Sequence, residues 1–362
     1  MSIRRIAIST GGGDAPGLNA VIRAVVLAGL NRGWEVYGVK KGYGGLLGED
    51  PLVRLDQESV RGITHLGGTI LGTTNRGNPF EWPVVMKSGK VHILDRSDEV
   101  IEAFQRNGFD AMIAIGGDGS LHIANRLARK GMPVVGVPKT IDNDLAATQV
   151  TFGFHTAVQT ASDALDKLHS TAESHERVMV VEVMGRNTGW IALFAGVSAT
   201  ADVILIPEIP YRIETVFDKI RERDASGRLF SIVVVAEGAM PVEGDPAVVE
   251  EARPGAAARY GGLAERVAGQ IAEATGKEVR SIVLGHLQRG GSPIAYDRLI
   301  ALRFGAAAVR TVAQERFGTM VAMDPPVVRA VPLQEAVERT KFVPLDSDII
   351  QTARDLGISF GD

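Results

Sequence analysis

The residues best suited to chemistry lie in the segment Pro138–Asp144, where a hydroxyl and two carboxylates follow an apolar run. The run Met132–Val137 is typical of a buried strand, and polar groups are costly to bury at such a place unless they have a task there. Asp142 and Asp144 alternate in what we expect to be a short exposed loop. One carboxylate can then take a proton from a hydroxyl while the other orients that hydroxyl. The alternative is an ordinary turn or cap.

Two further segments end in the same way. Ala111–Ile115 runs into Gly116–Ser120, and Ile6–Thr10 runs into Gly11–Asp14. In a parallel sheet, ligands bind at the carboxyl ends of the strands, and glycine-rich loops there let backbone N–H groups approach phosphates. We therefore expect these strand ends to deliver glycines and acids to one place.

Asp118 stands between two glycines at one of these strand ends. A carboxylate there can hold Mg²⁺ against phosphate oxygens while the neighbouring amides bind the phosphates. The alternative is an aspartate that caps the helix that follows.

Arginine and histidine recur at the ends of the later strands. Guanidinium and imidazole donors at such places suit a phosphoryl group on a substrate, although each one taken singly is more often a surface charge. Glu237 ends the run Val233–Ala236, where it is placed either to accept hydrogen bonds from sugar hydroxyls or to serve the structure. The basic residues of this set are Arg177, Arg186, Arg280, His286 and Arg289.

Strand-like and helical patterns alternate along the chain, which predicts the α/β class with mostly parallel sheets. Leu18, Val21, Ile22 and Val25 share one helical face, and Gly33 is placed to end that helix. Met240–Arg259 is typical of an exposed loop. Further strands are expected at 35–39, 178–183, 203–206, 232–236 and 282–284, apolar on both faces, with helices at 120–130, 156–170 and 263–275.

Composition narrows the class of protein. The 362 residues carry a net charge of -4, without a basic stripe for nucleic acid or a membrane surface. Cysteine is absent, which excludes disulfides, thiolate metal sites and a cysteine nucleophile. The first residues do not have the layout of a signal peptide, and no apolar stretch approaches the ~20 residues of a membrane span. We expect a cytoplasmic enzyme that binds neither nucleic acid nor membrane.

Taken together, these residues resemble the 6-phosphofructokinase family over nearly the whole chain. The segments PKTIDND, VVEVMGR and GHLQRGGSP, in this order, carry the resemblance. It implies two similar three-layer domains with mostly parallel sheets and the active site in the cleft between them. Residues 1–153 with 288–330 would form the phosphoryl-donor domain, and residues 154–287 with 331–362 the fructose 6-phosphate domain.

The resemblance also implies a role for each candidate. Asp142 would be the general base on the 1-hydroxyl of fructose 6-phosphate, supported by Thr140 and Asp144, and Asp118 would coordinate Mg²⁺. Arg186 would stabilise the transferring phosphoryl group, and Gly13 would bind its oxygens. The donor ATP would also be contacted by Arg76, Gly119, Ser120 and Lys139; the sugar site would be lined by Met184, Gly185 and Glu237, and the 6-phosphate held by Arg177, Arg280, His286 and Arg289.

Two positions bear on the phosphoryl donor. Lys139 is similar to the pyrophosphate-dependent members, whereas Gly119 matches the ATP-dependent type. This mixed pattern most often goes with ATP, so we expect ATP as co-substrate and keep the pyrophosphate-dependent enzyme as the alternative.

Other readings differ in class. A regulatory subunit that binds a sugar phosphate without catalysis would need the phosphate-binding arginines, but neither Asp118 nor Asp142. A lipid or NAD kinase would account for the GGDGS segment and leave the later basic set unexplained. In the bacterial enzymes that the chain resembles, two basic residues come from the neighbouring subunit. Arg177 and Arg280 therefore imply a homodimer or homotetramer that shares the sugar site.

Overall fold

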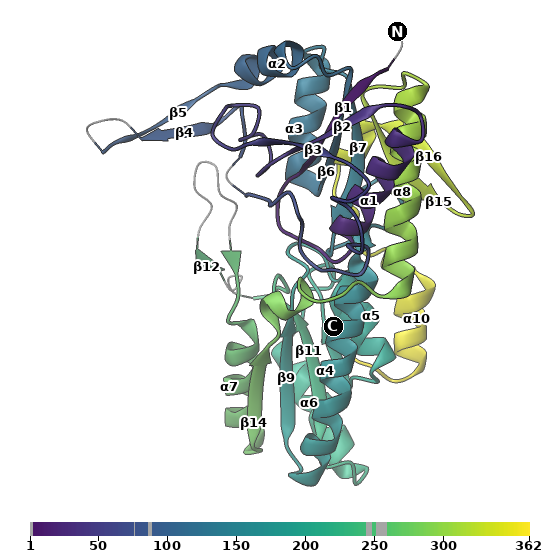
Figure 1. Cartoon of the computed structure of the whole chain (residues 1–362). Coiled ribbons are helices and arrows are strands. Elements are labelled where there is room, and N and C mark those ends of the chain that lie inside the picture. Colours follow the sequence, from purple (N-terminus) through teal and green to yellow (C-terminus); the bar gives the residue numbers. More distant parts are fainter. Residues whose placement is uncertain (1–2, 76, 86–88, 244–247, 251–258) are drawn as a thin grey trace. The chain divides into compact units, whose positions relative to one another are not determined.

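The computed structural model describes residues 3–75, 77–85, 89–243, 248–250 and 259–362 (Figure 1). The chain divides into two compact units. Unit 1 consists of Met1–His155 and Arg289–Thr340, and unit 2 of Thr156–Gln288 and Lys341–Asp362. Each unit contains a sheet covered by helices, which confirms the predicted α/β class with mostly parallel strands.

The main sheet of unit 1 has the order β16–β15–β7–β6–β1–β2–β3, and the short strand β8 pairs with β7. Its pairs are parallel except β2 with β3 and β15 with β16. A separate antiparallel pair is formed by β4 and β5. The strands are β1 (Arg5–Thr10), β2 (Glu35–Val39), β3 (Leu52–Leu55), β4 (Trp82–Val85), β5 (Val91–Leu94), β6 (Ala111–Gly116), β7 (Val134–Thr140), β8 (Phe152–Gly153), β15 (Thr319–Asp324) and β16 (Val327–Pro332).

Helices cover both faces of this sheet, as strands that are apolar on both sides require. Met112 and Ala114 of β6 share an apolar core with Leu121 of α3, and successive strand residues alternate between the two faces. Helices α1 and α8 pack tightly together, with Gly305 close to Ala24. The helices of unit 1 are α1 (Leu18–Leu30), α2 (Ser97–Arg106), α3 (Asp118–Arg129), α8 (Ala295–Ala313) and α9 (Leu333–Val337).

Unit 2 has a four-stranded parallel sheet in the order β10–β11–β9–β14. Its core joins valines of the inner strands to Val216 of α6 and Val267 of α7. The strands are β9 (Val178–Val183), β10 (Val203–Leu205), β11 (Ser231–Ala236) and β14 (Val279–Val283), with the small pair β12 (Val248–Glu250) and β13 (Arg259–Tyr260). The helices are α4 (Phe154–Ser174, which begins with two residues of unit 1), α5 (Trp190–Ser198), α6 (Ile213–Ala225), α7 (Leu263–Thr275), the 3₁₀ turn η1 (Gly285–Gln288) and α10 (Asp348–Asp355).

Two sequence expectations are corrected. The strand expected at 282–284 runs over Val279–Val283, and it is not covered on both faces because it is the edge strand of its sheet; Arg280, Ser281 and Val283 are exposed. Met240–Arg259 is not a loop throughout, since β12 pairs with β13. The rest of that prediction falls partly on residues 244–247 and 251–258, which lie outside the described residues.

Among the described residues, no helix is both long and apolar enough to cross a membrane.

Candidate active site

The ends of three neighbouring parallel strands of unit 1 form the predicted meeting place of glycines and acids. In the register of β1, β6 and β7, Thr10 pairs with Ile115 and Gly116 with Pro138. The Gly11 amide donates to the Ile115 carbonyl at 3.0 Å. At Gly117 there is little room for a side chain, because a Cβ atom there would come within 3.1 Å of the Lys139 carbonyl oxygen. Glycine thus lets these segments approach at the carboxyl edge of the sheet.

Asp142 lies inside the protein, so the expectation of an exposed loop was wrong. Asp142 and Thr140 are each 7% exposed, and Thr140 is the last residue of β7. The Asp142 amide donates to Thr140 Oγ1 at 3.1 Å, and that hydroxyl donates to Asp142 Oδ2 at 3.4 Å. The Thr140 hydroxyl therefore orients this carboxylate, and the same two bonds also form a local turn, so the alternative of a turn stays open.

The segment after Asp142 folds back over the end of β7. Asn143 adopts the left-handed conformation with φ 54°, and its Oδ1 accepts from the Thr151 amide at 3.2 Å. The Thr151 hydroxyl donates to the Thr140 carbonyl at 2.8 Å. This folding-back covers Asp142 and could not be read from the alternating acids alone.

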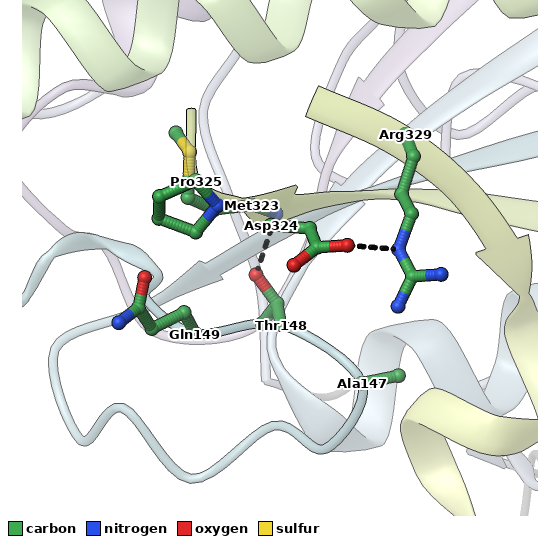
Figure 2. Close-up of a pocket in the computed structure, with 7 residues that line it drawn as sticks. All are labelled: Ala147, Thr148, Gln149, Met323, Asp324, Pro325 and Arg329. Atoms are coloured by element: carbon green, nitrogen blue, oxygen red, sulfur yellow. Dashed lines mark hydrogen bonds and ion pairs between the residues drawn. The ribbon is translucent and has the colours of Figure 1, made fainter. Parts of the chain in front are cut away.

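The far end of this segment is anchored at a surface cavity of about 530 Å³ in unit 1. Figure 2 shows Thr148 Oγ1 accepting from the Met323 amide, at 3.0 Å, and the ion pair of Asp324 with Arg329, also at 3.0 Å. The Gln149 amide adds a hydrogen bond to the Met323 carbonyl. None of the predicted site residues lines this cavity; the bonds of Thr148 and Gln149 to Met323 hold this end of the segment in place.

Lys139 is buried beside the glycines, with 3% of its surface exposed. Its Nζ donates to the Gly13 carbonyl oxygen. The pKa of Lys139 is lowered to about 8, first by burial and then by the nearby Arg289 charge, while the Asp142, Asp14 and Asp144 carboxylates act in the opposite direction. The ammonium therefore lies within the electrostatic reach of the predicted base.

Arg289 also lies at the glycines. Its Nη1 donates to the Asp14 carbonyl at 3.0 Å, and a Cβ atom at Gly13 would come within 2.9 Å of the same nitrogen. Of the four residues expected at the 6-phosphate, Arg289 alone belongs to unit 1. The structure thus brings Arg289 together with Gly13 and Lys139.

Asp118 begins helix α3 and is exposed. The N-cap is Gly117, so the alternative of a capping aspartate is wrong. A carboxylate in the first helical turn interacts favourably with the helix dipole, and Mg²⁺ at phosphoryl-transfer sites needs only one or two carboxylates because phosphates and water complete its shell. The described residues contain no group of three or more His, Cys, Asp or Glu that could enclose a metal ion. Asp118 therefore fits a metal ion that arrives with the donor phosphates.

Gly119 and Ser120 follow Asp118 in the first turn of α3. In the part of the chain that the structure describes, a Cβ atom at Gly119 would meet nothing within 4 Å, so packing against those residues does not require glycine there. Ser120 Oγ approaches Gly11, at 2.8 Å from the position of a Cβ atom. Arg76, the other residue expected at the donor, lies outside the described residues.

In unit 2, Arg177 and Arg280 meet at one carboxylate. Arg177 Nη2 lies 3.1 Å from Glu278 Oε1, and Arg280 Nη2 lies 2.5 Å from the same oxygen. The parallel pairing of β9 with β14 causes this, because it aligns Arg280 with Met179. His286 is exposed in η1, which follows β14.

The ends of β9 and β11 bring Arg186 and Glu237 together. Glu237 Oε1 accepts from the Arg186 amide at 2.9 Å, and Arg186 has φ 53°. Gly238 is required beside them, since a Cβ atom there would come within 2.0 Å of the Arg186 carbonyl oxygen. Met184 and Gly185 (φ 152°) connect the end of β9 to Arg186.

Sequence reasoning missed three residues around these groups. Thr73 and Thr74 both bind Gly12. Thr73 Oγ1 donates to the Gly12 carbonyl at 2.5 Å, and the Gly12 amide donates to the Thr74 carbonyl at 3.2 Å. Glu278 pairs with both Arg177 and Arg280. Only Glu278 had a signal in the sequence, because it is an acid close in the chain to Arg280.

Comparison with known proteins decides the family. Residues 5–312 match the sequence profile of the family described as Phosphofructokinase. This chain belongs to the phosphofructokinase family. It is 49% identical over 364 residues to the ATP-dependent 6-phosphofructokinase 2 of Clostridium perfringens, with 99% of both chains covered. It is 51% identical over 359 residues to the ATP-dependent 6-phosphofructokinase of Chloroflexus aurantiacus, covering 99% of this chain and 98% of the relative.

Solved phosphofructokinase structures have the same fold. The T-state phosphofructokinase of Pichia pastoris matches 99% of this chain with a TM-score of 0.78 and 30% identity, and the match spans 37% of that longer chain. The pyrophosphate-dependent phosphofructokinase of Marinobacter aquaeolei matches with a TM-score of 0.79 and 23% identity, covering 99% of this chain and 92% of its own. At that identity the second likeness concerns the fold alone.

Proposed function

We propose that this phosphofructokinase chain transfers the γ-phosphoryl group of ATP to the 1-hydroxyl of fructose 6-phosphate, giving fructose 1,6-bisphosphate and ADP in glycolysis. The observation that carries the proposal is the similarity, over 99% of the chain, to relatives named ATP-dependent 6-phosphofructokinase. The buried Asp142–Thr140 pair beside a glycine loop supports it. In this proposal unit 1 binds the phosphoryl donor and unit 2 the sugar.

Asp142 is the general base of the proposed reaction. Its carboxylate takes the proton of the 1-hydroxyl as the sugar oxygen bonds to the γ-phosphorus, and the bond from that phosphorus to the β,γ-bridging oxygen breaks to release ADP. The Thr140 hydroxyl orients the Asp142 carboxylate, and Asp144 supports it. Phosphoryl transfer depends mainly on positioning and charge stabilisation, so a carboxylate of ordinary basicity suffices.

Asp118 holds Mg²⁺ in this proposal. When bound, Mg²⁺ neutralises charge on the donor phosphates and orients them. The Gly13 amide binds phosphate oxygens, and the first turn of α3 offers the N–H groups and positive dipole end that favour anions. Ser120, Lys139 and Arg76 complete the proposed surroundings of the donor.

The sugar site is proposed mainly in unit 2. Met184, Gly185 and Glu237 line it, and Arg186 stabilises the transferring phosphoryl group. Arg186 is supported in this role by the Glu237 carboxylate, which fixes its backbone. The 6-phosphate is held by Arg177, Arg280, His286 and Arg289.

Arg177 and Arg280 are proposed to serve the sugar site of a neighbouring subunit, which makes the enzyme a homodimer or homotetramer. Their shared partner Glu278 supports this, since one carboxylate between two guanidinium groups leaves net positive charge for a phosphate. Location in the cytoplasm stays a prediction from the sequence.

ATP is preferred to pyrophosphate as donor. Among the described residues, no atom lies within 4 Å of a Cβ atom at Gly119, which supports room for the α-phosphate and ribose of a nucleotide. The pyrophosphate-dependent enzyme is the alternative. Of the two positions that bear on the donor, Lys139 favours pyrophosphate and Gly119 favours ATP. The non-catalytic subunit is disfavoured because Asp142 and Thr140 are arranged for proton transfer.

A coupled assay tests the proposal. Purified protein is mixed with fructose 6-phosphate, Mg²⁺ and either ATP or pyrophosphate, and fructose 1,6-bisphosphate is measured. We expect a kcat/KM at least about tenfold higher with ATP, a difference of about 1.4 kcal/mol in the barrier. A preference for pyrophosphate would overturn the donor assignment, and no product with either donor would overturn the activity.

A further inference from the structure

Side chains from three segments bind the carbonyl oxygens of the loop Gly11–Asp14, which we call the glycine loop. Thr73 Oγ1 donates to the Gly12 carbonyl, Lys139 Nζ to the Gly13 carbonyl, and Arg289 Nη1 to the Asp14 carbonyl. Three consecutive carbonyl groups are therefore held by donors that come from separate parts of the fold. Of these donors, the Lys139 ammonium is the most buried, and it needs such acceptors because an unpaired buried charge is costly.

Two amides of the glycine loop donate to backbone carbonyl groups of the protein, and a third does not. The Gly11 amide donates to the Ile115 carbonyl and the Gly12 amide to the Thr74 carbonyl, at 3.0 and 3.2 Å. Within the described residues, the Gly13 amide has no hydrogen-bond acceptor. A phosphate needs N–H donors and is repelled by carbonyl oxygens. Phosphate binding by the loop therefore requires that its carbonyl groups be bound by the protein and that an N–H group stay available.

We propose that Lys139 and Thr73 are positioning residues, which bind the Gly13 and Gly12 carbonyl groups and so keep the glycine loop in the one conformation that presents its N–H groups to a phosphoryl donor. Lys139 then acts on the donor through the loop and not as a direct ligand of the distal phosphate. The proposal deepens the proposed function and rests on it only for the identity of the donor.

The surroundings of Lys139 favour this role over direct binding. Its ammonium is already bonded to the Gly13 carbonyl, and its Nζ would lie 3.5 Å from a Cβ atom at Gly12. The Asp142, Asp14 and Asp144 carboxylates supply negative charge near it, and Arg289 supplies positive charge. A lysine held in this way supports the loop, whereas a lysine that bound the distal phosphate directly would first have to give up the Gly13 carbonyl.

Hydrogen exchange tests the support of the loop without reference to any substrate. Backbone exchange is followed by mass spectrometry in a peptide that covers the glycine loop, on full-length protein with no nucleotide added. The variants are Lys139→Met and Thr73→Val. Lys277→Met is the matched control, because Lys277 Nζ likewise donates to a carbonyl, that of Leu229 at 2.8 Å, but in unit 2.

We expect exchange of the glycine-loop amides to rise about tenfold in both variants and to stay unchanged in the control, since opening of the loop costs less when a support is removed. Unchanged exchange in Lys139→Met and Thr73→Val, with the parent melting temperature kept, would overturn the proposal. If Lys139→Met does not fold, Thr73→Val still decides, because it removes only one hydroxyl.

Kinetics separate the support from direct binding. Loss of the support should raise the KM for ATP about tenfold in each single variant, and the double variant should be little worse than either one, because both changes disorder the same loop. Lys139→Arg should restore most of the affinity, since it keeps a donor for the carbonyl. Additive effects of the two changes would mean that Lys139 binds the donor directly and would overturn the proposal. If the parent protein does not phosphorylate fructose 6-phosphate but the variants still show faster hydrogen exchange in the glycine loop, the proposed function is refuted. The positioning role of Lys139 and Thr73 then still holds.

Discussion

The two units use similar parallel sheets but hold their charged groups differently. In unit 1, Thr140, Asp142 and Lys139 lie at the end of an inner strand and are at most 7% exposed. In unit 2, Arg280 and His286 lie on or just after an edge strand and are exposed. Buried charges must have their partners in place when the protein folds, whereas exposed charges can take a new partner at little cost. We therefore assign the chemical step to the buried set and reversible phosphate binding to the exposed set.

The strongest test of this comparison is the removal of Asp142, the proposed base. Asp142→Asn should lower kcat about 100- to 10,000-fold, the usual contribution of general base catalysis, with a much smaller change in the KM for fructose 6-phosphate. Steady-state kinetics with purified protein measure both constants. The control is Asp98→Asn, which removes an exposed carboxylate of unit 1 that pairs with Lys130. A kcat within about threefold of the parent would exclude Asp142 as the base.

The second test concerns the donor side of unit 1. Gly119→Asp should lower kcat/KM for ATP about 100-fold or more, because a carboxylate about 4 Å from a phosphate is repelled by about 4 kcal/mol at an effective dielectric constant of about 20. Pyrophosphate has no α-phosphate to repel, so its use should be spared or increased. Gly119→Ala is the matched control, and it should stabilise α3 by about 0.5–1 kcal/mol because alanine is the better helix former. Equal ATP kinetics in the parent and Gly119→Asp would show that position 119 does not select the donor.

The third test concerns the exposed set. Arg280→Ala should raise the KM for fructose 6-phosphate about tenfold or more, because a charge-assisted hydrogen bond contributes about 1.5–3 kcal/mol. The KM for ATP should change less. Arg221→Ala is the control, since Arg221 is also an exposed arginine of unit 2 paired with a carboxylate, Asp218. A large loss of kcat at saturating sugar would contradict the assignment of this set to binding.

Mixed oligomers sharpen the same test. If Arg280 serves the site of a neighbouring subunit, hybrids of Arg280→Ala and Asp142→Asn chains contain some sites in which both residues are intact. We expect partial recovery of activity when the two inactive proteins are dissociated together and reassociated. No recovery in hybrids verified by native mass spectrometry would exclude a shared site.

The smallest expected effect is the pH dependence set by Lys139. Its pKa is lowered from 10.5 to about 8, mainly by burial and then by Arg289. We expect kcat/KM for ATP to fall about three- to fivefold between about pH 7.5 and 9, as the ammonium that supports the Gly13 carbonyl loses its proton. Lys139→Arg should move this fall to higher pH. A profile that is the same in the parent and Lys139→Arg would contradict the assignment.

The stability of the protein should change with pH in the opposite direction. Between about pH 8 and 10.5 the unfolded chain binds the Lys139 proton more strongly than the folded chain does, so the free energy of unfolding rises with pH across this window. The full rise is on the order of 3 kcal/mol. Urea unfolding of the parent and Lys139→Met at both ends of the window measures it, and the variant should lack the rise.

The sequence by itself determined the fold class and the family. Apolar residues on both faces of β6, β9 and β11 predict strands buried between layers of helices, and three strand-to-loop segments with glycine or aspartate predict phosphate chemistry at one edge. The PKTIDND segment had enough polar groups after an apolar strand to single out Asp142. These features are local, so they can be read along the chain.

Tertiary structure decided how those groups are held. Asp142 was expected in an exposed loop, but Thr151 and Asn143 fold that loop back over β7 and bury it. Thr73, Lys139 and Arg289 are far apart in the chain and meet only at the glycine loop. Val283 of strand β14 is apolar, yet it is exposed because β14 lies at the edge of its sheet. Burial and hydrogen-bond partners depend on which distant segments come together, and no local pattern of residues encodes that choice.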